Sequence, residues 1–226
     1  MKYIVIVASL LMVALMFSLT TQAGTFKDDF NDGNFDGWET IDFCGGSSSW
    51  KVENGMVVGK YPALGNQCGA SLLFSENDWR NYSIEFDAKM VEILSGWEAA
   101  IGIVIHINGI NGIWTYASPV TAAIESWNNF QILKSAVKAF DLQKNQWYRL
   151  KWVVGEDSIK LYIGGKLMAS LSGLLLPIGR FGFYVRACEA LYDNVVITWD
   201  DVKGNYFAVS RQDKLSSTWG SIKAIK

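Results

Sequence analysis

Short runs of alternating apolar and polar residues recur along most of this 226-residue chain, separated by clusters of Gly, Asn, Asp and Ser. A period of two places apolar side chains on one face of an extended strand, whereas a helix needs a period near 3.6. The clearest runs are residues 83–89, 99–107, 147–154, 158–163 and 180–188. Asn54-Gly55 and Gly164-Gly165 each stand between two such runs, and both dipeptides favour the positive φ angles of a tight hairpin turn. The pattern predicts an all-β fold, a two-sheet antiparallel sandwich of the jelly-roll type.

Alternation also predicts which side of each strand faces the core. The four isoleucines of residues 99–107 should point inward, and so should the following side chains of two other strands: Ile84, Phe86, Ala88, Phe181, Phe183, Val185 and Ala187. The opposite sides of these three strands would then form one polar outer face. We expect that face to hold Glu85, Asp87, His106, Tyr184 and Arg186.

The N-terminus has the layout of a secretory signal peptide. A single early charge, Lys2, precedes an apolar run of about 16 residues and the small-residue end Thr21-Gln22-Ala23. That run is shorter than the roughly 20 residues that span a bilayer, which argues against the alternative of an uncleaved anchor. We expect residues 1–23 to be removed and residues 24–200 to fold as one exported domain, secreted, periplasmic or on the cell surface. Residues 201–226 would form a tail or short helix outside it, and no stable membrane insertion is expected after cleavage.

The three cysteines fit an exported protein, because disulfides persist in oxidising compartments. Cys44 and Cys68 both lie in glycine-rich segments near the start of the domain, and we predict that they form a disulfide. Cys188 would be a buried thiol on a strand. The alternative is three free cysteines, since an odd number leaves at least one unpaired within the chain.

The composition excludes one class of partner and leaves another open. A net charge of −2 with scattered Lys and Arg lacks the basic surface of a nucleic-acid binder, so we expect no nucleic acid. Ten Trp residues supply rings both for a β-sandwich core and for flat surfaces on which sugars stack.

Five segments together resemble a known superfamily: residues 29–38, 50–56, 147–155, 179–183 and 192–195. They are similar to the concanavalin A-like lectin/glucanase superfamily, and within it to laminin-G-like domains, 3-keto-disaccharide hydrolase-type domains and levanase fructan-binding modules. The resemblance spans about residues 26–198 and implies a jelly-roll sandwich. This architecture hosts lectins, enzymes and adhesion modules alike, so the fold alone does not define the chemistry.

An acidic run follows the predicted cleavage site and contains Asp28, Asp29, Asn31 and Asp32. Calcium binds six to eight oxygen atoms, and these side chains supply several within one glycine-rich segment. Asp193 would add another if the first and last strands are neighbours, as the resemblance implies. A structural calcium ion is therefore one interpretation of the run. The other is an Asx-rich turn, in which the side chains accept hydrogen bonds from their own backbone.

A sugar site needs a flat aromatic surface and planar charged groups that fit vicinal hydroxyls. The expected polar face offers such groups in Glu85, Asp87, His106, Tyr184 and Arg186. Candidate stacking residues, which we expect in loops, are Trp97, Trp114, Tyr116 and Trp127. The alternative for Glu85 and Asp87 is a polar strand face paired with Lys or Arg on neighbouring strands.

Two features argue against catalysis. Retaining glucanases of the superfamily carry Glu-x-Asp-x-x-Glu on one strand, but here Glu85-Phe86-Asp87 is followed by Met90, so the second glutamate is missing. Domains of the 3-keto-disaccharide type usually carry Gly-Asn-Ser-Gly before a central strand, and residues 97–102 lack it. The sequence therefore predicts a non-catalytic, lectin-like domain that binds a glycan or polysaccharide. The alternatives are a glycoside hydrolase or 3-keto-disaccharide hydrolase-like enzyme, and a structural or adhesion module of the cell surface.

Overall fold

The protein is described from a computed structural model that covers residues 24–45, 47–62, 69–79, 81–95, 98–109, 111–129, 131–174 and 179–199. Side chains are described throughout these ranges except at 75–79. The predicted signal peptide at 1–23 and the predicted tail at 201–226 lie outside the described residues. Within the described ranges, no helix is long and apolar enough to cross a membrane.

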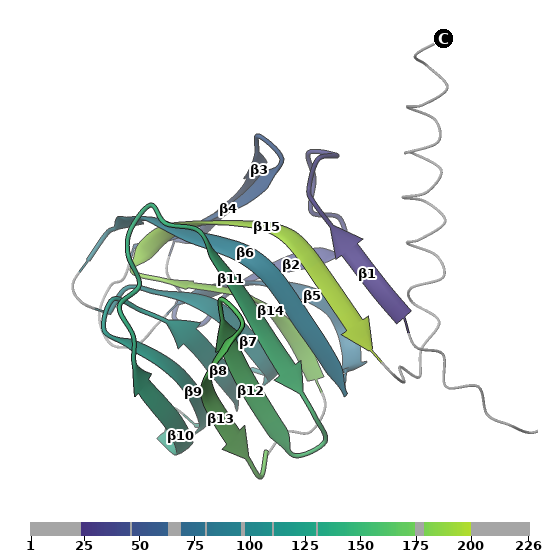
Figure 1. Cartoon of the computed structure of the whole chain (residues 1–226). Helices are drawn as coiled ribbons and strands as arrows, with labels where there is room; N and C mark the ends of the chain where they lie inside the picture. The colour runs from purple at the N-terminus through teal and green to yellow at the C-terminus, as the bar shows by residue number, and fades with distance from the viewer. Residues whose placement is uncertain are drawn as a thin grey trace, which may run out of the picture.

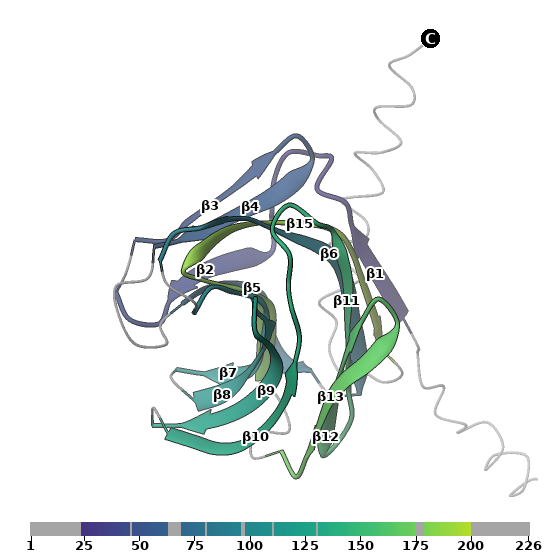
Figure 2. The same ribbon diagram turned by 60° about the vertical axis from the view of Figure 1, so that its left-hand side comes forward.

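The described strands form two antiparallel sheets, which are the two layers seen in Figure 2. The eight-stranded sheet has the order β13 (Lys166–Ser172), β12 (Ser158–Ile163), β11 (Tyr148–Val154), β6 (Tyr82–Ile93), β15 (Cys188–Trp199), β4 (Met56–Tyr61) and β3 (Ser49–Glu53), with β1 (Gly24–Asp28) also on β15. The seven-stranded sheet has the order β10 (Gln131–Ala139), β9 (Thr121–Asn128), β8 (Asn111–Ala117), β7 (Ala100–Asn108), β14 (Gly179–Arg186), β5 (Ala70–Trp79) and β2 (Trp38–Asp42). The predicted two-sheet sandwich is confirmed.

The first and last strands lie side by side. β1 pairs with the second half of β15, from Gly24 opposite Trp199 to Asp28 opposite Val195, and Figure 1 shows the two strands adjacent. The first half of β15 pairs with β4, so this long strand has β6 on one side and two shorter strands in succession on the other.

The space between the sheets holds the main hydrophobic core. Ile84, Phe86 and Ala88 point into it from β6, and the inward residues of β14 meet them from the other sheet, as alternation predicts. Buried hydrogen bonds cross this core. Tyr192 Oη on β15 donates to the backbone carbonyl of Tyr184 on β14 at 2.7 Å. Trp152 Nε1 on β11 donates to Thr115 Oγ1 on β8 at 2.7 Å. Because both groups are fully buried, this bond fixes one sheet relative to the other.

Both predicted hairpin turns are confirmed. Asn54 and Gly55 have φ angles of 53° and 72° between β3 and β4, and Gly164 and Gly165 have φ angles of 56° and 79° between β12 and β13. Positive φ at both central positions is the feature that these dipeptides supply at low cost.

The predicted alternation is wrong at two positions where a residue other than glycine has a positive φ. His106 has φ 54°, the register of β7 shifts after Ile105, and its side chain lies buried near the core residue Tyr82 instead of on an outer face. The same shift moves Ile107 to the opposite side of the sheet from the other isoleucines. Ala187 has φ 52° between β14 and β15, and Ala187 and the next residue, Cys188, both point into the core, so strict alternation ends there.

Candidate functional site

The single polar face expected from the sequence does not form, because its members belong to different sheets. Glu85 and Asp87 lie on β6 of the eight-stranded sheet, whereas Tyr184 and Arg186 lie on β14 of the seven-stranded sheet. His106 is buried. Alternation separates inward from outward residues, but a sandwich has two outward sides. The two outer sides are named here the eight-strand face and the seven-strand face.

On the eight-strand face, Arg149 of β11 joins the carboxylates of Glu85 and Asp87. Its Nε lies 2.7 Å from Glu85 Oε1 and its Nη1 lies 3.3 Å from Asp87 Oδ1. Lys151 Nζ lies 3.3 Å from Glu85 Oε2, and Asn194 Nδ2 donates to Asp87 Oδ2 at 2.9 Å. Burial raises the pKa of Glu85, but the hydrogen bonds and charges of Arg149 and Lys151 outweigh it and lower the pKa. These contacts match the structural alternative, a polar face paired across neighbouring strands.

The acidic run after β1 forms consecutive Asx turns. Asp28 Oδ1 accepts from the backbone N–H of Phe30 at 3.1 Å, Asp29 Oδ1 from Asn31 at 3.3 Å, and Asp32 Oδ1 from Asn34 at 3.2 Å. In the described part of the chain, no group of three His, Cys, Asp or Glu side chains is placed to hold a metal ion. The geometry thus matches the turn interpretation, and calcium binding stays a prediction.

Asp193 lies near the junction of this run and the eight-strand face. Its Oδ1 accepts the backbone N–H of Asn194 at 2.6 Å. Burial raises the pKa of Asp193, and the negative charges of Asp87 and Asp29 raise it further. The charged form of this carboxyl is therefore disfavoured in the folded protein.

The seven-strand face has two rows of side chains that run across the strands in register. The first row, from β10 to β2, is Val137, Ala123, Tyr116, Gly102, Tyr184, Ser71 and Ile41. The second row is Ser135, Glu125, Trp114, Val104, Gly182, Leu73 and Glu39. Neighbours in a row are separated by one strand spacing, about 4.8 Å.

One half of this face is filled by its own side chains. Tyr184, Leu73 and Val104 belong to a second hydrophobic cluster, and the ring of Trp114 contacts Phe43 with 5.5 Å between centroids. Gly102 lies beneath this layer, where a Cβ atom would meet the backbone oxygen of Thr115 at 2.1 Å. The face is consequently closed over β14, β7 and β5. The part over β8, β9 and β10 is called the open half, because Trp114, Glu125 and Trp127 are partly exposed there and β10 is mostly exposed, although Tyr116 and Ala123 are buried.

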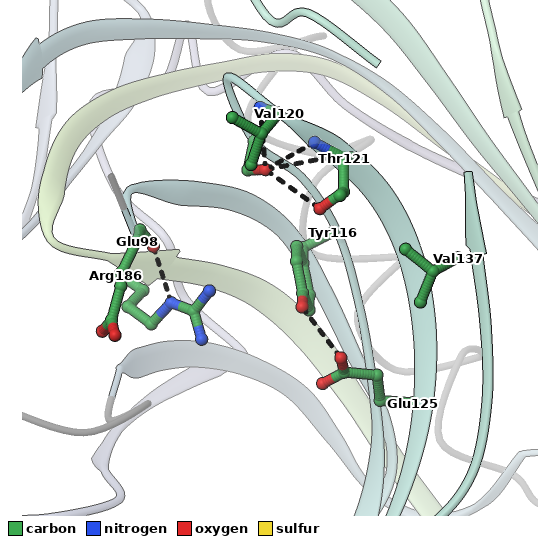
Figure 3. A pocket seen from close by; sticks show the side chains of 8 residues that line it. Glu98, Tyr116, Val120, Thr121, Glu125, Val137 and Arg186 are labelled. Atoms are coloured by element: carbon green, nitrogen blue, oxygen red, sulfur yellow. Dashed lines mark hydrogen bonds between the residues drawn. The ribbon is translucent and has the colours of Figure 1, made fainter. Parts of the chain in front are cut away.

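A pocket of about 280 Å³ lies in the open half (Figure 3). Its lining residues are Glu98, Tyr116, Ser118, Val120, Thr121, Glu125, Val137 and Arg186.

The guanidinium of Arg186 points into this pocket although the residue is only 9% exposed. Its Nε donates to the backbone carbonyl of Glu98 at 2.8 Å, and its Cζ lies 5.1 Å from the ring centroid of Tyr116. It makes no ion pair with any residue in the described ranges. Burial raises the pKa of Tyr184 to about 12 and the pKa of Tyr116 still further, so both hydroxyls keep their protons at neutral pH.

Glu125 is, with Glu98, one of two carboxylate residues in the lining, and two hydrogen-bond donors hold it. Its Oε1 accepts from Tyr116 Oη at 3.0 Å and its Oε2 from Trp127 Nε1 at 3.1 Å. Trp127 in turn packs edge-on against Trp114 at 5.9 Å between centroids. Each carboxylate oxygen keeps a second lone pair that can accept another hydrogen bond.

The sequence analysis missed Glu125, although alternation within residues 121–128 places it on the same side as Trp127. Trp114, Tyr116 and Trp127, expected in loops, are strand residues of β8 and β9. Tyr116 lies beside Arg186, whereas Trp114 and Trp127 lie further along β8 and β9, next to Glu125. Trp97 lies outside the described residues.

Cys188 is a buried free cysteine, as predicted. Cys68 lies outside the described residues, so the Cys44–Cys68 disulfide stays a prediction.

The fold is the two-sheet jelly roll of the concanavalin A-like lectin/glucanase superfamily. In this chain the pocket lies on the outer side of the seven-stranded sheet. Within this superfamily, the chain belongs to the family described as the 3-keto-alpha-glucoside-1,2-lyase-like domain, whose model matches residues 25–198. A search of curated protein sequences finds no match.

Solved structures share the fold at low sequence identity. Carbohydrate-binding module CBM66 from Bacillus subtilis superposes with a TM-score of 0.58 at 18% identity, covering 72% of this chain and 95% of that one. The Bacillus licheniformis beta-glucanase gives 0.55 at 12%, covering 78% and 98%. A putative glycosyl hydrolase from Parabacteroides distasonis gives 0.53 at 14%, covering 77% and 92%.

Proposed function

We propose that the protein binds carbohydrate in the pocket on the open half of the seven-strand face and does not cleave it. The observation that carries this proposal is the buried guanidinium of Arg186, which faces the fixed carboxylate of Glu125 across Tyr116. The guanidinium interacts with the Glu98 carbonyl, the Tyr116 hydroxyl and the charge of Glu98, but it forms no ion pair within the described residues, so a ligand acceptor would satisfy its remaining donors. Vicinal sugar hydroxyls accept from a guanidinium and donate to a carboxylate at the same time.

The charges of the pocket favour a neutral sugar. One cation, Arg186, shares the lining with two carboxylates, Glu98 and Glu125. An anionic sugar would add a third negative charge in a partly buried space, where charge repulsion is weakly screened. Trp127 and Trp114, both partly exposed, flank Glu125 and offer apolar rings to the C–H face of a sugar.

Two further lines support the proposal. The family is described by its relation to a glucoside-acting lyase, and one structural neighbour is a carbohydrate-binding module. The predicted signal peptide would place the domain outside the cytoplasm, where polysaccharides are met. The absence of cleavage is supported by Met90, which is buried in the core where the glucanase motif has its second glutamate.

The second candidate is an enzyme that cleaves a glycoside. It is favoured by the family description and by the presence of two carboxylates, Glu98 and Glu125, in the same pocket. Prolonged incubation with α-glucosides and 3-keto-α-glucosides, with product detection by mass spectrometry, separates the two candidates. Turnover that Glu125→Gln abolishes would establish the enzyme, and intact substrates together with saturable binding would establish the lectin.

The binding proposal is tested by a glycan array followed by calorimetric titration of the best neutral glycan, with and without a chelator. Glu125→Gln keeps the side-chain shape, and Arg186→Lys keeps the charge but loses the planar pair of donors. A hydrogen bond to a charged group contributes about 1.5–3 kcal/mol, so each variant should weaken binding at least about tenfold. Glu85→Gln is the matched control on the eight-strand face and should bind like the unmodified protein. Failure of the array to detect any glycan, or an equal loss in Glu85→Gln, would contradict the proposal.

A further inference from the structure

The pocket has a polar end and an apolar end. Arg186 and Glu98 lie on one side of Tyr116. Val137 lies on the other side, above Glu125, and Val120 lies at the top of the view (Figure 3). Tyr116, Ala123 and Val137 are consecutive in the first row, so Tyr116 and Val137 are two strand spacings apart, about 10 Å. The residue between them, Ala123, is fully buried beneath its neighbours.

The apolar end is unusually open to solvent. Val137 is 56% exposed and Val120 is 50% exposed, although both line the pocket. The loop that carries Val120 is held against the end of β10, because the backbone N–H of Phe140 donates to the carbonyl of Val120 at 3.2 Å. Ile132, 45% exposed, lies further along β10 on the same face, opposite Trp127.

Exposed hydrophobic residues are concentrated at the β10 edge of the seven-stranded sheet. Of the seven exposed large hydrophobic residues in the described ranges, four lie on β10 or in the loop before β9: Val120, Ile132, Leu133 and Val137. Two of these four, Val120 and Val137, line the pocket. A group of exposed apolar side chains is typical of a surface that a ligand covers, whereas single exposed apolar residues are normal on protein surfaces.

We infer that the ligand is a neutral glycoside with an apolar aglycone. The inference rests on the proposed function and names the ligand class of the same pocket. The sugar ring lies between Arg186 and Glu125, over Tyr116, and the aglycone lies over Val137 and Val120. Covering these two side chains removes apolar surface from water, which a sugar alone, with hydroxyls on most of its edge, achieves less completely.

Matched glycosides test the inference. Methyl and phenyl glycosides of D-glucose, D-galactose and D-mannose, in both anomers, are titrated calorimetrically into the mature protein. The phenyl glycoside of the preferred sugar should bind about tenfold more tightly than its methyl partner. Val137→Ser should remove that difference by weakening the binding of the phenyl glycoside more than that of the methyl glycoside. Val153→Ser, at an exposed valine on β11 of the other sheet, is the matched control and should keep the difference.

The outcomes separate the two proposals. Equal affinities for methyl and phenyl glycosides overturn the apolar-aglycone inference and leave carbohydrate binding in place. A phenyl preference that survives Val137→Ser, or that Val153→Ser removes equally, also overturns the inference. If no glycoside of the panel binds and the glycan array is empty, both proposals fail together.

Discussion

Replacing Thr115 by Val tests how the two sheets hold the site in place. Thr115 lies on β8 between Trp114 and Tyr116, and its Oγ1 accepts the 2.7 Å hydrogen bond from Trp152 Nε1 of the other sheet. Both residues are fully buried. Valine has nearly the same shape as threonine but offers no acceptor, so the substitution leaves the indole N–H unpaired inside the core.

The expected change in the free energy of unfolding follows from two opposing contributions. A buried donor left without a partner costs about 1–3 kcal/mol, whereas the added methyl group gains up to about 0.8 kcal/mol by burial. We expect Thr115→Val to lower the free energy of unfolding by about 1–2 kcal/mol. For a domain of this size that corresponds to a fall in Tm of roughly 2–8 °C.

Urea denaturation followed by Trp fluorescence measures this change, and an unaltered m-value shows that the unfolded state is unaffected. The double variant with Trp152→Phe isolates the hydrogen bond, because removing both partners should cost less than the sum of the single changes by at least about 0.5 kcal/mol. If Thr115→Val is as stable as the unmodified protein, or if the two changes are additive, the inter-sheet bond does not contribute as argued.

Four further predictions concern the periphery of the sandwich. Burial and neighbouring carboxylates raise the pKa of Asp193, so its negative charge lowers the stability of the folded protein once the pH exceeds that raised value. Asp193→Asn should therefore raise Tm at pH 7. It should change Tm little near pH 3, where the carboxyl is protonated in the folded and the unfolded state. Arg149 lowers the pKa of Glu85, and this pairing stabilises the folded protein until the pH falls through the lowered pKa. Arg149→Gln should raise the pKa of Glu85 in an NMR titration and reduce the stability that the protein loses on acidification. An unchanged pKa would contradict the pairing. Thiol titration of the unfolded, unreduced mature protein should find a single free thiol, and three would exclude the Cys44–Cys68 disulfide. Since Asx turns already use the carboxylates after β1, a chelator should leave Tm unchanged, and a rise in Tm on adding calcium would instead establish the metal site.

The sequence predicted the architecture well where local rules act alone. Asn54-Gly55 and Gly164-Gly165 form the expected turns, and the isoleucines of β7 face the core up to Ile105. The prediction was wrong at His106, and alternation ends after Ala187, because a positive φ at each of these residues changes the side on which the next residues lie. Periodicity alone does not reveal a positive φ, which is uncommon in residues other than glycine even though His is enriched there.

The site was predicted only in part, because alternation does not identify the sheet to which a strand belongs. Glu85 and Arg186 both point outward, yet from opposite layers, and only the strand order separates them. Trp127 was found through its residue type, but its neighbour Glu125 was not. What distinguishes Glu125 is that it accepts hydrogen bonds from Trp127 on its own strand and from Tyr116 on the neighbouring strand, and the second partner is not evident from residues 121–128 alone.

The central claim, that a sugar binds beside Glu125 on the open half of the seven-strand face, is tested most directly by ¹H–¹⁵N NMR of the Trp indole groups. The indole N–H of Trp127 donates to Glu125, while that of Trp152 lies between the sheets and serves as an internal control. During titration with the best glycan, the Trp127 signal should shift in a saturable manner and the Trp152 signal should stay in place. Saturable binding that leaves Trp127 unmoved would place the ligand elsewhere and contradict the account.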